Sequence, residues 1–132
     1  MFKVNFLKFS FVLIPSLLLM ACANHQISSQ KPKCQVNTRI ERNAIPKTPH
    51  NMSLPEFGQG VIGWATGPKG AKARLENIQQ QDLKDIQQKG TTLAMVKEWQ
   101  AFYENEVQRN PCNPTAQYRA ELMKKIANLW AN

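Results

Sequence analysis

Two stretches with helical periodicity follow each other closely at the C-terminal end of the chain. In residues 93–109 and again in residues 114–130, large apolar side chains recur every three or four positions, which is the spacing of one face of an α-helix. Asn110 and the proline after it end the first stretch. Asn113 and Pro114 suit the start of the second, as an N-cap and a first helical residue. Because so short a link makes the two helices antiparallel neighbours, we expect this hairpin to hold the core.

Shorter helical signals precede the hairpin. Ser53 and Glu56 stand three residues apart, as in a capping box that starts a helix. Three glycines follow between residues 58 and 63, so the segment is predicted to be either a tightly packed short helix or a turn-rich loop. The glycines formally match G-x-G-x-x-G. Since no strand precedes them, the match does not indicate a nucleotide site.

Two further helices are expected before the hairpin, one starting at Pro68 and one from about Gln80 to Lys89. Gly90 should stop the second of them. No stretch alternates apolar and polar residues with a period of two, so no sheet is predicted. The predicted fold class is therefore all-α, a small helical domain of four to five helices around a C-terminal antiparallel helix hairpin, preceded by a flexible leader.

The leader is poor in large apolar residues and rich in proline and polar side chains. A segment of this kind buries too little apolar surface to offset the entropy of ordering it. We expect three parts, namely a signal peptide over residues 1–21, a flexible tether over residues 22–52 and the helical domain over residues 53–132.

The first 21 residues have the features of a targeting segment. Lys3 and Lys8 precede an apolar run from Phe9 to Ala21 that is too short to span a membrane as a helix. The run ends in Leu19-Met20-Ala21-Cys22, which resembles the lipobox of bacterial lipoproteins. That resemblance implies cleavage before Cys22 and attachment of a diacylglycerol and an N-acyl chain to it. Ala23 rather than aspartate follows, which by the same resemblance favours the outer membrane over the inner membrane. The alternative is an ordinary secretory signal with an unlipidated cysteine.

The formal net charge of +8 is concentrated near the N-terminus. Residues 23–55 hold five basic side chains and one acid, Glu41, whereas the rest of the domain is nearly balanced. This stretch is either a solvated tether or a segment attracted to anionic headgroups or to an acidic partner. It lacks aromatic side chains that could stack on bases, which disfavours nucleic acid as a partner.

Lipidation of Cys22 would leave Cys34 and Cys112 as an even pair. In an oxidising compartment the two are candidates for an intramolecular disulfide. Two buried free thiols and an intermolecular bridge remain the alternatives.

Few residues suggest catalysis. Both histidines lie in the leader, no Cys and His cluster has metal-ligand spacing, and we expect neither a metal nor a cofactor. Glu106 and Arg109 form either an ordinary ion pair on a helix face or an acid–base or cation site. A second group is either a solvated surface or a binding site for a phosphate or carboxylate. It consists of Trp64, Lys69, Lys72 and Arg74.

Three strings in residues 56–130 look like a small domain found at the C-terminal tips of polymorphic bacterial toxins. They are the glycine-rich segment from Phe57 to Gly67, the W-x-x-F-Y-x-x-E string from Trp99, and the R-N-P-x-N-P-x-A-x-x-R-x-x-L-M string from Arg109. The resemblance implies no assigned reaction.

Three functions follow from these observations. The first is a non-enzymatic outer-membrane lipoprotein, held in the bilayer by its acylated N-terminus, whose periplasmic helical domain binds a protein or envelope component. The second is a toxin-like catalytic domain acting on nucleic acid or cell wall, with Glu106, Arg109 and Arg119 as candidate residues. The third is a periplasmic immunity protein.

Overall fold

The computed structural model describes residues 34–131 of the chain. Four α-helices form its body, and they are α1 (Gly67–Asn77), α2 (Gln80–Gln88), α3 (Leu93–Arg109) and α4 (Pro114–Trp130). A 3-10 turn, η1 (Pro49–Asn51), and a π-helix, η2 (Glu56–Ile62), precede them. The described residues contain no strand. The all-α fold class is thereby confirmed.

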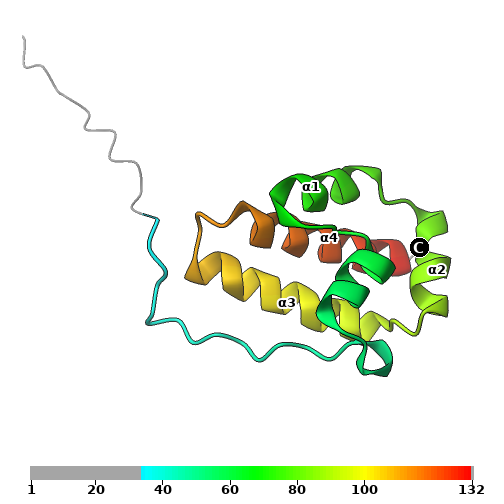
Figure 1. Ribbon diagram of the computed structural model, residues 1–132, viewed down its shortest axis with the longest axis horizontal. Coiled ribbons are helices and arrows are strands. Elements are labelled where there is room, and N and C mark those ends of the chain that lie inside the picture. Colours follow the sequence, from blue (N-terminus) through cyan, green and yellow to red (C-terminus); the bar gives the residue numbers. More distant parts are fainter. Residues whose placement is uncertain (1–33, 132) are drawn as a thin grey trace, which may run out of the picture. The chain divides into compact units, whose positions relative to one another are not determined.

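The predicted hairpin is the centre of the fold. Helices α3 and α4 lie side by side and antiparallel, and α1 packs across α4 (Figure 1). The Thr92 hydroxyl caps α3 by accepting a hydrogen bond from the Met95 N–H at 3.2 Å. The Asn113 side chain caps α4 in the same way, through the Ala116 N–H at 3.3 Å. Both caps satisfy N–H groups that a helix start leaves without an intrahelical partner.

The large apolar residues of α4 are not all buried. Leu122, Met123 and Ile126 are fully buried, but Tyr118, Leu129 and Trp130 are only partly covered. Instead, the face turned to the core begins with two small residues, Ala116 and Ala120. Small side chains let α3 approach closely, so the large residues near the helix end need not supply that contact.

The glycine-rich segment folds as the π-helix η2 rather than as a loop. The Gly58 carbonyl accepts the N–H groups of Gly63 at 2.8 Å and Trp64 at 2.9 Å, which closes the wide turn. Gly63 follows η2 with φ of 84°, a left-handed conformation that glycine adopts without steric cost. Of the predicted capping box, the Glu56 N–H to Ser53 Oγ bond is present at 3.3 Å.

An aromatic cluster fills the space between η2 and α3. Neighbouring ring centroids lie between 5.2 and 5.9 Å apart, mostly edge to face. Such pairs stabilise a core beyond the area that they bury. The cluster consists of Phe57, Trp64, Trp99, Phe102 and Tyr103.

The part of the predicted tether that the structure describes is attached to the helices. Residues 34–48, which we name the strap, run along α3 in an extended course (Figure 1). The Trp99 indole N–H donates to the Lys47 carbonyl at 3.1 Å. The Asn37 N–H donates to the Arg109 carbonyl at 2.7 Å. The low apolar content of residues 34–52 predicts a flexible tether, but in the structure these residues belong to the ordered body. They are ordered because α3 supplies hydrogen-bond partners for the strap.

The disulfide links the strap to the turn of the hairpin. The Cys34 and Cys112 sulfurs are bonded at 2.09 Å, and the Cα atoms are 5.4 Å apart. Of the three alternatives for these cysteines, the structure has the intramolecular bridge. It fixes the start of the strap beside the link between α3 and α4.

The predicted signal peptide, the predicted lipidation site Cys22 and the predicted tether up to residue 33 lie outside the described residues. Within residues 34–131, no helix is both long and apolar enough to cross a membrane.

Candidate functional site

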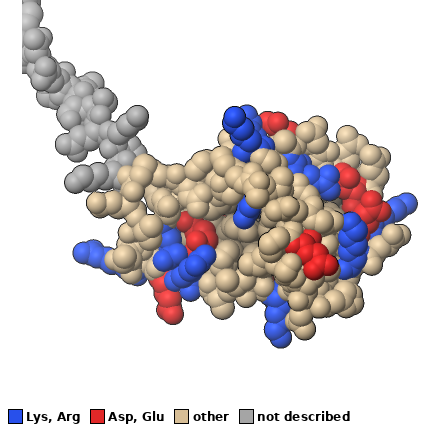
Figure 2. Space-filling model, in the orientation of Figure 1, with Lys and Arg blue, Asp and Glu red and all other residues tan. Residues whose placement is uncertain are grey.

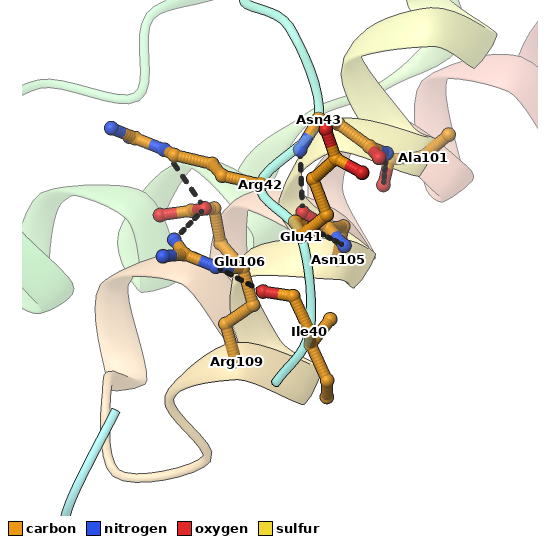
Figure 3. A network of polar contacts seen from close by, with 8 residues as sticks. All are labelled: Ile40, Glu41, Arg42, Asn43, Ala101, Asn105, Glu106 and Arg109. Atoms are coloured by element: carbon orange, nitrogen blue, oxygen red, sulfur yellow. Dashed lines mark hydrogen bonds and ion pairs between the residues drawn. The ribbon is translucent and has the colours of Figure 1, made fainter. Parts of the chain in front are cut away.

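Polar side chains of α3 hold the middle of the strap (Figure 3). The Asn105 side chain accepts the Asn43 N–H at 2.9 Å and donates to the Glu41 carbonyl at 3.0 Å. One turn further along, Arg109 Nε donates to the Ile40 carbonyl at 3.2 Å. Since both helix residues bond to backbone atoms, they fix the position of the strap independently of its side chains.

Glu106 accepts hydrogen bonds from two arginines at the centre of this network (Figure 3). Arg42 Nε lies 3.0 Å and an Arg109 terminal nitrogen 2.9 Å from the same carboxylate oxygen. The Glu106 side chain is only 17% exposed. The ion pair between Glu106 and Arg109 that the i,i+3 spacing indicated is therefore present, and the strap adds a second cation to it. The carboxylate carries one charge and faces two, so the group as a whole is positive.

Arg119 of α4 lies against the aromatic cluster. Its guanidinium carbon is 4.7 Å from the Trp64 ring centroid and 5.6 Å from that of Tyr103, distances typical of cation–π contacts. It donates to the Tyr103 hydroxyl at 3.2 Å and to the Ala65 carbonyl at 3.3 Å. Ala65 has φ of 49°, an uncommon left-handed conformation for a non-glycine residue.

The guanidinium of Arg119 is incompletely satisfied. Its buried Nε has no hydrogen-bond partner, and no carboxylate within the described residues forms an ion pair with it. A guanidinium has five N–H donors, and two hydrogen bonds are made here. Arg119 therefore retains donors for a further acceptor.

Burial raises the pKa of the Tyr103 hydroxyl, while the Arg119 cation opposes that rise. The phenol consequently stays protonated at neutral pH. It accepts a hydrogen bond from Arg119, and its own proton remains available for donation.

A hollow of about 260 Å³ opens between the strap, α3 and the first turns of α4. We name it the Arg119 hollow. Arg42, Tyr103, Glu106 and Arg119 provide its functional groups, and the remaining lining residues are Ile45, Leu54, Trp99, Phe102, Asn113, Thr115 and Ala116. Large aliphatic side chains also line it, and Ile45 and Leu54 are 55% and 42% exposed. The hollow thus combines cations with an exposed apolar rim.

A second hollow of about 240 Å³ lies next to the first. It shares Leu54, Tyr103 and Arg119 with the Arg119 hollow and adds Trp64. Arg119 therefore borders both hollows.

The second group predicted from the sequence does not come together as an anion site. Trp64 is 4% exposed, within the core. Arg74 turns inward, where it donates to the Ile62 carbonyl at 2.8 Å and lies 3.4 Å from an Asp82 oxygen. Lys72 pairs with Glu76 on the same helix at 3.6 Å, and Lys69 makes no polar contact that ties it to the other three. Of these four residues, only Trp64 borders one of the two hollows, and the cation in that hollow is Arg119.

The candidate catalytic residues are partly assembled. Glu106 and Arg119 line the same hollow, and Arg109 binds Glu106 from outside the lining. Within residues 34–131, no group of three or more His, Cys, Asp or Glu side chains lies close enough to hold a metal ion. Charged groups of both signs are interspersed on the face seen in Figure 2, where no single-sign patch dominates.

Sequence reasoning missed Arg42, Ile45, Leu54 and Tyr103 as site residues. Arg42 was assigned to the tether, so its contact with Glu106 was not expected. The pairing of Cys34 with Cys112 was the one signal that could have brought residues near 40 towards the end of α3.

Fold and site define a small, disulfide-linked all-α domain with an arginine-lined hollow. A family model described as a domain of unknown function (DUF4951) matches residues 32–130, so the chain belongs to this family. The chain is also similar to a solved structure described as the NMR structure of the protein from Acinetobacter baumannii. The two are 58% identical, with a TM-score of 0.64, over 71% of this chain and 88% of that one. No curated protein matches the chain. The family description mentions neither lipid attachment nor toxins, so both remain predictions.

Proposed function

We propose that this chain is a membrane-anchored bacterial lipoprotein whose helical domain faces the periplasm and binds an envelope protein. The anchor is the diacylglycerol and acyl chain on Cys22, and the outer membrane is the bilayer that holds it. The domain acts by binding rather than by catalysing a reaction.

The disulfide is the observation that carries this proposal. Disulfides form in oxidising compartments such as the periplasm and are rare in the cytosol. The bridge uses Cys34 and Cys112, and the chain has three cysteines. Cys22 is thus the remaining one, directly after Leu19-Met20-Ala21. The bond supports export, and the position of Cys22 at the end of a lipobox-like sequence, outside this bridge, supports lipidation.

The geometry around Glu106 favours binding over catalysis. A general base needs a carboxylate free to accept a proton from the substrate, but one oxygen of Glu106 already accepts from both Arg42 and Arg109. His50 does not line the Arg119 hollow. The exposed rim of Ile45 and Leu54 provides apolar contact area for a protein partner.

Fractionation of cells tests the anchor. The full-length chain should sediment with outer membranes, and Cys22→Ser should appear in the soluble periplasmic fraction. Cys112→Ser is the control, because it also replaces a cysteine and breaks the disulfide but leaves the lipobox intact, so it should still sediment with outer membranes. If Cys22→Ser sediments as the original chain does, the anchor is not at this residue and the proposal is wrong.

Expression without residues 1–21 separates binding from catalysis. In a strain whose cytoplasm is oxidising enough to form the Cys34–Cys112 bridge, a binding domain should be harmless. Growth arrest that Glu106→Ala relieves would instead establish the catalytic alternative.

A further inference from the structure

We propose that the Arg119 hollow binds an acidic side chain of the partner protein, presented on an extended segment whose neighbouring residues are apolar. This inference rests on the proposed binding function and specifies the chemistry of the partner.

The charges that surround the hollow favour an anion. Arg42 and Arg119 line the hollow with a single carboxylate, that of Glu106, and Arg109 binds this carboxylate from outside the lining. Two of these cations bind Glu106, so the third is left with no acidic partner among the described residues. Arg119 lies against Trp64 and Tyr103, a low-dielectric surface on which a charge–charge contact is stronger than in water.

The hydrogen-bond donors favour a carboxylate. A planar guanidinium matches the two oxygens of a carboxylate. Each terminal nitrogen of Arg119 carries two N–H groups and uses one of them within the protein, so two donors are left over. The Tyr103 hydroxyl, which borders the same hollow, has a proton to donate. A bound carboxylate would satisfy donors that the protein leaves open.

The size of the hollow favours a side chain over a small-molecule ligand. Its volume of about 260 Å³ lies below the range of about 300–1,000 Å³ that is typical of ligand pockets. One acidic side chain fits this space, and the adjacent hollow of about 240 Å³ gives a neighbouring residue a place beside Trp64. The exposed Ile45 and Leu54 side chains suit apolar residues on either side of the acid.

The test is an NMR titration of the ¹⁵N-labelled mature chain, purified from bacterial envelopes in detergent. The probes are the peptides acetyl-Ala-Leu-Asp-Leu-Ala-amide and acetyl-Ala-Leu-Asn-Leu-Ala-amide. They have the same shape and differ by one charge. The signals to follow are the Arg119 Nε–H and the Trp64 indole N–H, with the indole N–H of Trp130, which lines neither hollow, as an internal reference. We expect the aspartate peptide to shift the first two and to bind at least fivefold more tightly than the asparagine peptide.

Three variants define the site, and a fourth, Arg119→Lys, replaces the first if that one does not fold. Arg119→Gln should weaken binding of the aspartate peptide at least tenfold. Lys124→Gln should not change its affinity, because Lys124 is an exposed cation of the same helix outside the hollow. Ile45→Ser should weaken it about threefold, since it shortens the apolar rim and leaves every cation in place. If Arg119→Gln does not fold, Arg119→Lys keeps the charge but loses the planar fork, and it should still weaken binding at least threefold.

Several results would overturn the inference. Equal affinity for the two peptides would show that the carboxylate is not recognised. Shifts that persist in Arg119→Gln would place the peptide elsewhere. Inorganic phosphate or acetate binding as tightly as the peptide would reduce the hollow to a general anion site. Since peptide binding does not require residue 22, these outcomes leave the test of the membrane anchor untouched, and a failed anchor leaves the titration valid.

Discussion

Gly58 is predicted to be the least replaceable glycine of the chain. A Cβ at this position would lie 2.0 Å from Nε1 and 2.4 Å from Cε2 of the Trp64 ring. Ordinary contacts of a Cβ begin near 3.4 Å, so the ring would have to retreat by about 1.4 Å. Trp64 is 4% exposed and is packed against Phe57, Trp99 and Tyr103, which leaves it no free space.

The cost of Gly58→Ala follows from this overlap. Overpacking a core costs about 1–3 kcal/mol, and alanine returns about 0.5–1 kcal/mol because it restricts the unfolded chain and favours the helix. The overlap is large and the ring is enclosed, so we expect a net loss of about 2 kcal/mol. For a domain of this size that corresponds to a melting temperature lower by roughly 10 °C.

Gly60→Ala is the matched control. It lies in the same π-helix, and a Cβ there would meet nothing within 4 Å. It should leave the free energy of unfolding unchanged or raise it by about 0.5 kcal/mol. Urea denaturation followed by tryptophan fluorescence measures both variants. Equal stabilities, within about 0.5 kcal/mol, would refute the close approach of Trp64 to η2.

Three other predictions concern the strap and the site. The double variant Cys34→Ser, Cys112→Ser should have a free energy of unfolding lower by about 2–5 kcal/mol in urea denaturation. The bridge closes a sequence separation of 78 residues, for which the chain-entropy model gives about 4.5 kcal/mol. An unchanged midpoint of urea denaturation would contradict this prediction. Glu106→Gln should lower the free energy of unfolding by about 1 kcal/mol and speed amide hydrogen exchange at Asn43, since it removes the charge between two arginines. Exchange as slow as in the original chain would show that Glu106 does not hold the strap in place. Tyr103 has a pKa raised above its unfolded value of about 10, so its contribution to stability should be constant below pH 10 and fall as the pH rises beyond it, where the unfolded chain loses the proton first; Tyr103→Phe should make the loss of stability above pH 10 less steep.

The helix hairpin could be predicted because its signals are local. The apolar period, the Asn113 cap and the proline after it all act within a few residues, and the structure keeps each of them. The exposed ends of α4 were less predictable. Whether Trp130 or Ala120 faces the core depends on how closely α3 approaches, and that distance is set by the whole packing arrangement.

The strap could not be predicted from its own composition. Its partners are Asn105, Glu106 and Arg109, which lie more than 60 residues further along the chain. The strap contains few large apolar residues, so nothing in its own sequence indicates order. The ordering comes from side chains of α3 and from the bond to Cys112.

The candidate site was predictable by residue type but not by arrangement. Glu106 and Arg119 stood out as charged residues on helical stretches, and they do share a hollow. Trp64 was predicted to be near a surface anion site, yet its ring is enclosed because Gly58 has no side chain to keep it away. Arg74 similarly turns towards the Ile62 carbonyl, a partner that no spacing rule indicates.

The most direct test of the account is the intact mass of the mature chain purified from bacterial envelopes. We predict the mass of residues 22–132 with Cys34 bridged to Cys112, increased by a diacylglycerol and one acyl chain on Cys22. A mature chain that starts at Cys22 without lipid, or one that still carries residues 1–21, would contradict the proposal that this domain works at a membrane surface.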